Sequence, residues 1–186
     1  MNLRNLSLST KVFAGFICLA IISSIISYID LTSADSSNTI TQGIIKIRTP
    51  KIIDLLNLKY DISAIKSAQR TLISRDASMN DRERQYKNIE TYFISLKENY
   101  NNYDKMKKDS FGSEKWESFK TTFKIWEELH NKLISKSKEL DNALKLNYSN
   151  VDNLYKELAQ ITLVELAEYT TKTESIIDEL VDYNLK

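Results

Sequence analysis

Apolar residues recur at alternating spacings of three and four along most of this chain, which places them on one face of a helix. The most regular row is spaced 4, 3, 4, 3, 4, 3, 4 and consists of Phe119, Phe123, Trp126, His130, Leu133, Ser137, Leu140 and Leu144. The 186 residues include only 3 Gly and 1 Pro, whereas an average chain of this length has roughly 13 Gly and 9 Pro. Because so few helix breakers allow few turns, the sequence predicts long helices and an all-α fold.

Four amphipathic segments are separated by short turn-forming stretches. The expected helices cover about residues 30–75, 81–107, 114–146 and 150–186. The expected caps are Asn80 or Asp81 for the second helix, Ser113 after a break at Gly112 for the third, and Ser149 with Asp152 for the fourth. Long amphipathic helices joined by short loops predict an up-down-up-down four-helix bundle.

Two rows have an irregularity. The core row of the first helix consists of Leu55, Leu58, Ile62, Ile65, Gln69 and Leu72. Pro50 precedes this row and should bend the helix rather than end it, because the pattern resumes at Ile52. In the fourth helix the row is in phase up to Ile161 and continues, shifted, from Leu166.

The segment Val12–Ile29 is 18 residues long and carries no charge, which is sufficient for a membrane-spanning helix continuous with the first bundle helix. Basic residues precede it and acidic residues follow it, so residues 1–11 are expected in the cytoplasm and residues 30–186 outside the inner membrane. A cleaved signal peptide is the alternative, but its apolar region is usually about 7–15 residues. Leu31–Asp35 is also a poor cleavage site, so we favour an uncleaved anchor.

Composition argues against several classes of function. The formal net charge is +1 and no basic stripe is interleaved with aromatic residues, so nucleic acid is not an expected partner. One Cys and one His cannot form a metal centre, which needs several N or S ligands, and no cofactor is expected. Neither a glycine-rich phosphate loop nor a catalytic triad stands out, so we do not expect an enzyme. His130 is interpreted as a hydrogen-bonded core histidine.

The first helix carries a second row about 100° around from its core row. This row consists of Ile45, Thr49, Ile52, Leu56, Lys59, Ser63, Lys66 and Arg70. Its apolar half would suit a second copy of the same helix, giving a homodimer. Lys66 and Arg70 of both copies would then repel each other unless an anion lay between them. The alternative is that both are solvated charges; Arg75, in the last turn, fits the helix dipole.

The opening "MNLRNLSLSTKVFAGF" and the order of anchor, four-helix sensor and return toward the membrane resemble the N-terminal half of a methyl-accepting chemotaxis receptor. The resemblance covers almost the whole chain. It implies a dimeric extracytoplasmic bundle that senses small molecules. It also implies a second membrane span, a linker domain and a cytoplasmic signalling hairpin, so we expect a fragment or a gene product without its output half.

Within this family, "KSAQR" (Lys66–Arg70) is similar to the basic-Ser-Ala-X-Arg stretch of the aspartate-sensing receptors. The resemblance implies that Lys66 and Arg70 bind carboxylates at the dimer interface. It also points to the start of the fourth helix, at Tyr148, Ser149 and Asn150. A third basic residue expected on the first helix falls on Asp61, which leaves the ligand's identity open.

The leading hypothesis is therefore a receptor that binds a small carboxylate and transmits a shift of the fourth helix across the membrane. Sensing through a periplasmic binding protein is a second route. A membrane-anchored helical scaffold without a ligand, or the sensor of a histidine kinase or a cyclic-dinucleotide enzyme, remain alternatives.

Overall fold

The structure is a computed structural model that describes residues 8–146 and 148–185, and every element in this part of the chain is helical. The chain divides into two compact units, Met1–Ile47 and Arg48–Lys186.

The described part of the first unit contains helix α1 (Leu8–Gly43) and all but the last residue of the π-helical turn η2 (Ile44–Arg48). Within the described residues, Gly15–Ser33 is the one helical stretch long and apolar enough to cross a membrane, and none of it is buried. Pro50 does not end the helix. It has no N–H to bond the carbonyl of Lys46 four residues earlier, and the wider π turn lies at this place.

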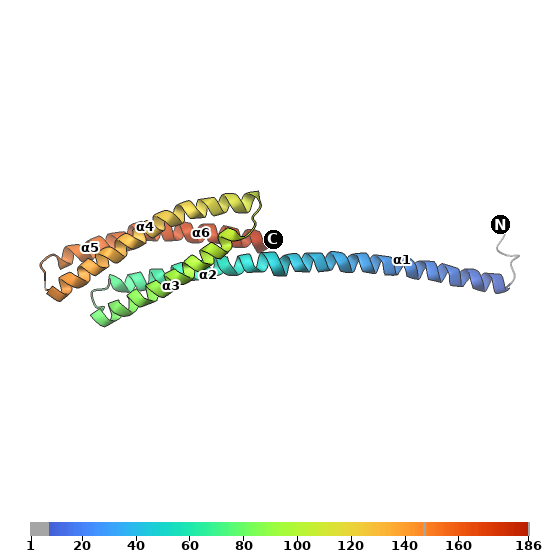
Figure 1. Cartoon of the computed structure of the whole chain (residues 1–186), viewed down its shortest axis with the longest axis horizontal. Coiled ribbons are helices and arrows are strands. Elements are labelled where there is room, and N and C mark those ends of the chain that lie inside the picture. Colours follow the sequence, from blue (N-terminus) through green and yellow to red (C-terminus); the bar gives the residue numbers. More distant parts are fainter. Residues whose placement is uncertain (1–7, 147, 186) are drawn as a thin grey trace. The chain divides into compact units, whose positions relative to one another are not determined.

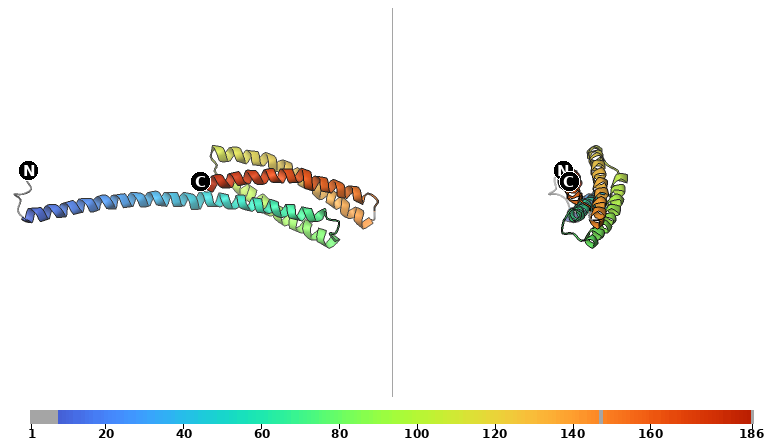
Figure 2. Two further views of the ribbon diagram at one scale, coloured as in Figure 1. Left: turned by 180° about the vertical axis from the view of Figure 1, so that it is seen from behind. Right: turned by 90° about the vertical axis from the view of Figure 1, so that its left-hand side faces the viewer.

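The second unit is an up-down-up-down four-helix bundle, as predicted (Figure 1). Its first three helices are α2 (Thr49–Leu72), α3 (Met79–Lys105) and α4 (Ser110–Leu146), and the fourth is built from α5 (Val151–Gln160), η3 (Ile161–Glu165) and α6 (Leu166–Leu185). The α2–α3 and α4–α5 turns lie at one end of the bundle, and the α3–α4 turn and the C-terminus lie at the other (Figures 1 and 2). We call these the turn end and the C-terminal end.

The core is formed by the rows that the sequence predicts. On α2 the buried side chains include Leu55, Leu58, Ile62, Ile65, Gln69 and Leu72, and on α4 they include Phe119, Phe123, Trp126, His130, Leu133, Ser137 and Leu140. Burying an aliphatic or aromatic side chain of this size contributes about 1.5–3 kcal/mol. These rows therefore supply most of the drive for the helices to pack together.

The shift in the fourth row is explained by η3. The buried row passes from Ile161 to Leu166, a step of five, and the π turn accommodates the extra residue. The hydroxyl of Thr162 in this turn is buried and lacks a hydrogen-bond partner among the described residues. Thr170 on α6, in contrast, donates to the carbonyl of Leu166 four residues earlier.

Helix starts differ from the prediction. The N-cap of α3 is Ser78, not Asn80 or Asp81; Ser78 Oγ accepts from Asp81 N at 3.1 Å, and the Asp81 carboxylate accepts from Ser78 N at 3.3 Å. This reciprocal capping box needs an extended residue three positions before the acid, which Ser78 provides.

The other two caps also differ. Gly112 lies inside α4 rather than breaking it, because the Asp109 carboxylate accepts from its N–H at 2.8 Å and starts the helix earlier. Asn150 occupies the N-cap position of α5 without a side-chain hydrogen bond, so Ser149 is not the cap. Asp152 is instead used by an ion pair between helices.

Candidate functional site

A polar hollow lies on the exposed face of α2. Its lining residues are Ser63, Lys66, Ser67, Arg70, Thr71 and Ser74. Five of them lie on one face of α2, because their spacings are those of neighbouring turns, and Ser74 follows in the turn after the end of the helix at Leu72. Two cations and four hydroxyls with no carboxylate among them favour an anionic guest. We call this surface the α2 hollow.

Lys66 is only partly exposed and lies near an acidic residue of the same chain. Its Nζ is 3.9 Å from Glu174 Oε2 on α6. About two turns earlier on α2, Lys59 Nζ lies 2.5 Å from Asp178 Oδ1, which is also on α6. Such exposed pairs contribute about 0–1 kcal/mol each, so a ligand carboxylate could compete for Lys66 at little cost.

Arg70 differs from Lys66 in having no acidic partner. Its side chain is exposed, and among the described residues no carboxylate lies within ion-pair distance of it. Its guanidinium offers five N–H donors in a planar fork that matches a carboxylate. It is therefore the group of the α2 hollow best placed to hold an anion from outside the chain.

The remaining predicted site residues, Tyr148, Ser149 and Asn150, are exposed in the α4–α5 turn. They lie at the same end of the bundle as the end of α2, because Arg75 Nη1 is 2.8 Å from Asp152 Oδ1 at the start of α5. No hydrogen bond or ion pair between described residues joins any of the three to Lys66 or Arg70. The structure thus brings Lys66 and Arg70 together and leaves the turn residues apart from them.

Arg75 does not lie in the last turn of a helix, as the sequence predicted, but in the α2–α3 turn beyond Leu72, where it makes an inter-helix contact. Besides Asp152, its guanidinium lies over the ring of Tyr155, 4.7 Å from the centroid. The two contacts tie the end of α2 to α5 and leave Arg75 outside the α2 hollow.

Asp61 shows why the predicted cationic set is incomplete. This residue is buried and turned toward α3, where its carboxylate accepts from Ser95 Oγ at 2.8 Å and Asn99 Nδ2 at 3.1 Å. Burial raises the pKa of Asp61, and the two hydrogen bonds oppose that rise. Asp61 therefore joins α2 to α3 and does not line the α2 hollow.

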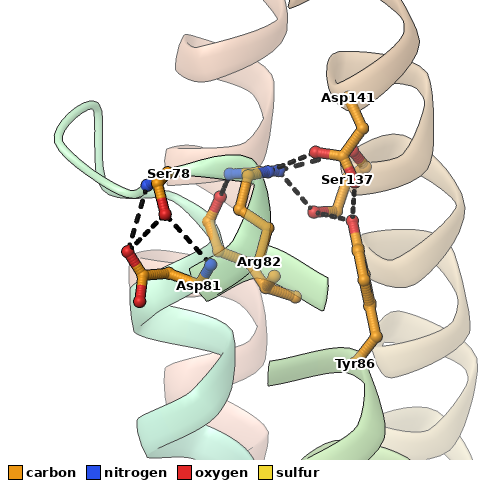
Figure 3. A network of polar contacts seen from close by, with 7 residues as sticks. Ser78, Asp81, Arg82, Tyr86, Ser137 and Asp141 are labelled. Atoms are coloured by element: carbon orange, nitrogen blue, oxygen red, sulfur yellow. Dashed lines mark hydrogen bonds and ion pairs between the residues drawn. The ribbon is translucent and has the colours of Figure 1, made fainter. Parts of the chain in front are cut away.

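A buried polar network that the sequence did not reveal lies at the turn end of the bundle. Arg82 on α3 is fully buried and extends toward α4 (Figure 3). Its Nε pairs with Asp141, its Nη1 donates to the carbonyl of Leu72, and its Nη2 lies 2.9 Å from Ser137 Oγ. One guanidinium thus joins the end of α2, the start of α3 and the C-terminal third of α4.

Tyr86 completes this network. Its hydroxyl lies 2.6 Å from Asp141 Oδ2 and 2.7 Å from Ser137 Oγ. Burial and the hydrogen bond to the Asp141 carboxylate raise the pKa of Tyr86 to about 12. The phenol therefore stays protonated and donates a hydrogen bond to that carboxylate. Arg82 lies four residues before Tyr86 and therefore on the same face of the helix, which is the pattern that could have revealed it.

Residues 5–186 match the family described as a four helix bundle sensory module for signal transduction. The chain belongs to this family. Neither a curated protein nor a solved structure gives a significant match. The sensory module of chemotaxis receptors is thus the class predicted from the sequence, and it is a signalling module rather than a catalytic one.

The sensory module keeps His130 as a buried core residue, as predicted. Its ring stacks between Phe93, at a centroid distance of 5.0 Å, and Trp126, at 5.4 Å. Gln69 Nε2 lies 2.8 Å from its Nδ1. Burial lowers the pKa of His130 to about 4, so the ring is neutral at pH 7. An amide NH₂ group can only donate, so Nδ1 accepts and the proton resides on Nε2.

Proposed function

We propose that this sensory module is the ligand-sensing region of a bacterial chemotaxis receptor and binds a small carboxylate in the α2 hollow. The observation that carries the proposal is the lining of that hollow by two cations and four hydroxyls, with Arg70 lacking an acidic partner in the described chain. Two charge-assisted hydrogen bonds from a guanidinium would fix the orientation of the carboxylate.

A second copy of the chain would complete the site. Ligand pockets bury roughly 70–90% of a small ligand, whereas the lining of the α2 hollow comes from α2 and the residue Ser74 just after it, on one side only. On the same face, Leu56 is 48% exposed and belongs to the row that would pack against a symmetry mate. In the homodimer, Lys66 and Arg70 of both copies would surround the anion.

Signal transmission would use the contact between α2 and α6. A carboxylate bound by Lys66 competes with Glu174, so binding would weaken one of the two ion pairs that join α2 to α6 among the described residues. A ligand shifts a conformational equilibrium only by its different affinity for the two states. Loss of this pair supplies such a difference along the fourth helix.

The membrane location of the module is part of the proposal. The helix Gly15–Ser33 is long enough to span a bilayer, and the basic residues Arg4 and Lys11 precede it. We take it as an uncleaved anchor in the inner membrane, with the N-terminus in the cytoplasm and the bundle outside.

The test uses the full chain in lipid nanodiscs, with ligand binding followed by the thermal unfolding of the bundle. Trp116 and Trp126 are both buried on α4 and report this transition by fluorescence. We expect a stabilising shift with at least one small mono- or dicarboxylate, such as succinate. Arg70→Ala should weaken that ligand by tenfold or more, since a hydrogen bond to a charged group contributes about 1.5–3 kcal/mol.

Arg84→Ala is the matched control, because Arg84 is exposed on α3, does not line the α2 hollow, and pairs with Asp81 at 2.9 Å. A chain that dimerises but responds to no carboxylate would favour the scaffold or a periplasmic binding protein as the partner. Dimerisation is measured separately with Ser63→Cys in a Cys18→Ser background. Cross-links should form at Ser63, and not in the control Ser118→Cys on α4; the reverse pattern would contradict the α2 interface.

A further inference from the structure

The seam between α3 and α4 is bridged by large side chains rather than by close backbones. The backbone of α2 packs closely against α3 and α6, and that of α4 against α5 and α6. Between α3 and α4, toward the C-terminal end, Tyr100 packs its ring 5.2 Å from Trp116 and 5.4 Å from Phe123. Aromatic rings therefore fill this half of the seam.

Toward the turn end, the same seam opens into a groove of about 370 Å³. Its apolar lining includes Ile89, Phe93 and Ile94 of α3 and Ile134 of α4, and His130 of α4 also lines it. Ile94 at the rim is 65% exposed, whereas Ile89 is buried at 4%. The volume falls within the ordinary range of small-molecule sites, roughly 300–1,000 Å³. We call this space the α3/α4 groove.

The groove begins where a ladder of stacked rings ends. The ladder follows α4 through Trp116, Phe119, Phe123, Trp126 and His130, with interplanar angles of 8°, 9°, 16° and 17° between successive rings. Phe93 lies against its last ring at an angle of 12°. Beyond His130 the apolar lining is mainly aliphatic, with Ile89, Ile94 and Ile134, and Tyr86 lies at the side of the Arg82 network. A planar aromatic guest would therefore continue the filling that rings provide elsewhere in the seam.

Polar groups around the groove favour a single negative charge on the guest. Lys138 lines the groove from α4, is exposed, and has no acidic partner among the described residues. His130 contributes its Nε2–H, since Nδ1 is occupied by Gln69. Glu90 lines the groove from α3 and would repel a second negative charge. One carboxylate is therefore compatible with this lining, and two are not.

We propose that the α3/α4 groove is a second binding site, which takes a planar aromatic monocarboxylate. The ring packs against Phe93, Ile134 and the end of the ring ladder, and the carboxylate faces Lys138. This site lies within one copy of the chain and is independent of the α2 hollow. Occupying it would fix the spacing of α3 and α4 next to the Arg82 network, because Tyr86 belongs to both.

The test is equilibrium dialysis of the full chain in nanodiscs against radiolabelled phenylacetate. We expect saturable binding of the label, which unlabelled phenylacetate displaces. Two competitors should displace the label less well: cyclohexylacetate, because its ring is not planar, and phenylmalonate, because it is a dianion. Lys138→Met should weaken the affinity for phenylacetate about fivefold. Displacement of the label by benzyl alcohol, which carries no charge, should be unchanged in this variant. Lys124→Met is the matched control, since Lys124 lies two heptads earlier on α4, is exposed and does not line the groove.

Two further variants locate the site. Ile134→Trp fills the groove and should abolish phenylacetate binding. Ile94→Glu adds a negative charge at an exposed rim position, where folding is not at risk, and should weaken phenylacetate binding. Arg70→Ala should leave phenylacetate binding unchanged, which separates this site from the α2 hollow. Absence of saturable binding at millimolar phenylacetate, or binding that Arg70→Ala removes and Ile94→Glu leaves intact, would overturn the proposal.

Discussion

Asp141→Ala is expected to destabilise the bundle by about 3–5 kcal/mol, because it removes the charge partner of a fully buried guanidinium. The remaining partners of Arg82 are neutral: the Leu72 carbonyl and the Ser137 hydroxyl. Tyr86 would lose the carboxylate that accepts its hydrogen bond. Urea unfolding of the full chain in nanodiscs, followed by the fluorescence of the two tryptophans on α4, measures the change.

A double-mutant cycle isolates the pair from its surroundings. Arg82→Met combined with Asp141→Leu removes both charges, and we expect it to cost less than either single change, since apolar replacement of a whole buried ion pair is often neutral or stabilising. Arg84→Met is the control for loss of an exposed arginine on the same helix and should cost about 0–1 kcal/mol. Additive effects of the two single changes would show that the pair is not coupled.

The periodic rows explain why the bundle could be predicted from sequence. Each row states which face of a helix is buried, and this holds even where a member is polar. Gln69 and Ser137 lie on predicted core rows and are buried, because each finds a partner on another helix: His130 for Gln69 and Arg82 for Ser137. The step from Ile161 to Leu166 likewise indicated the shift that the π turn accommodates.

Pairings between helices could not be predicted in the same way. That Arg82 meets Asp141, or that Lys66 lies near Glu174, depends on the axial offset of two helices, which neither helix's own pattern encodes. Helix starts were missed for a related reason. Ser78 becomes a cap only once the α2–α3 turn gives it an extended backbone. From the sequence alone, neighbouring residues such as Asn80 and Asp81 were equally suitable caps.

The predicted site shows the same division. Lys66 and Arg70 share the α2 hollow because residues four positions apart on a helix are neighbours, whatever the tertiary structure. The residues of the α4–α5 turn were assigned to the same ligand site by family resemblance. Their place in that site, which would form in the dimer, stays a prediction. Asp61 could be assigned to the α2–α3 contact only with Ser95 and Asn99 opposite it.

The stability of the bundle is expected to fall by about 3 kcal/mol between pH 6.5 and pH 4 because of His130. Burial lowers its pKa from 6.5 to about 4 in the folded chain. Above pH 6.5 the ring is neutral in both states and contributes nothing to the pH dependence. Below pH 6.5 the unfolded chain binds the proton first, so unfolding becomes progressively more favourable until the folded ring also titrates near pH 4.

Because the chain has 1 His, the variant His130→Phe removes this contribution without leaving another imidazole. Phenylalanine keeps a ring between Trp126 and Phe93 but leaves Gln69 without its acceptor, so the variant should be less stable at pH 7. The informative quantity is the slope of the unfolding free energy between pH 6.5 and 4. The raised pKa of Asp61 acts in the opposite direction, since the folded chain then takes that proton first. If the slope of His130→Phe equals that of the unchanged chain, the neutral buried histidine is not what the acid dependence reports.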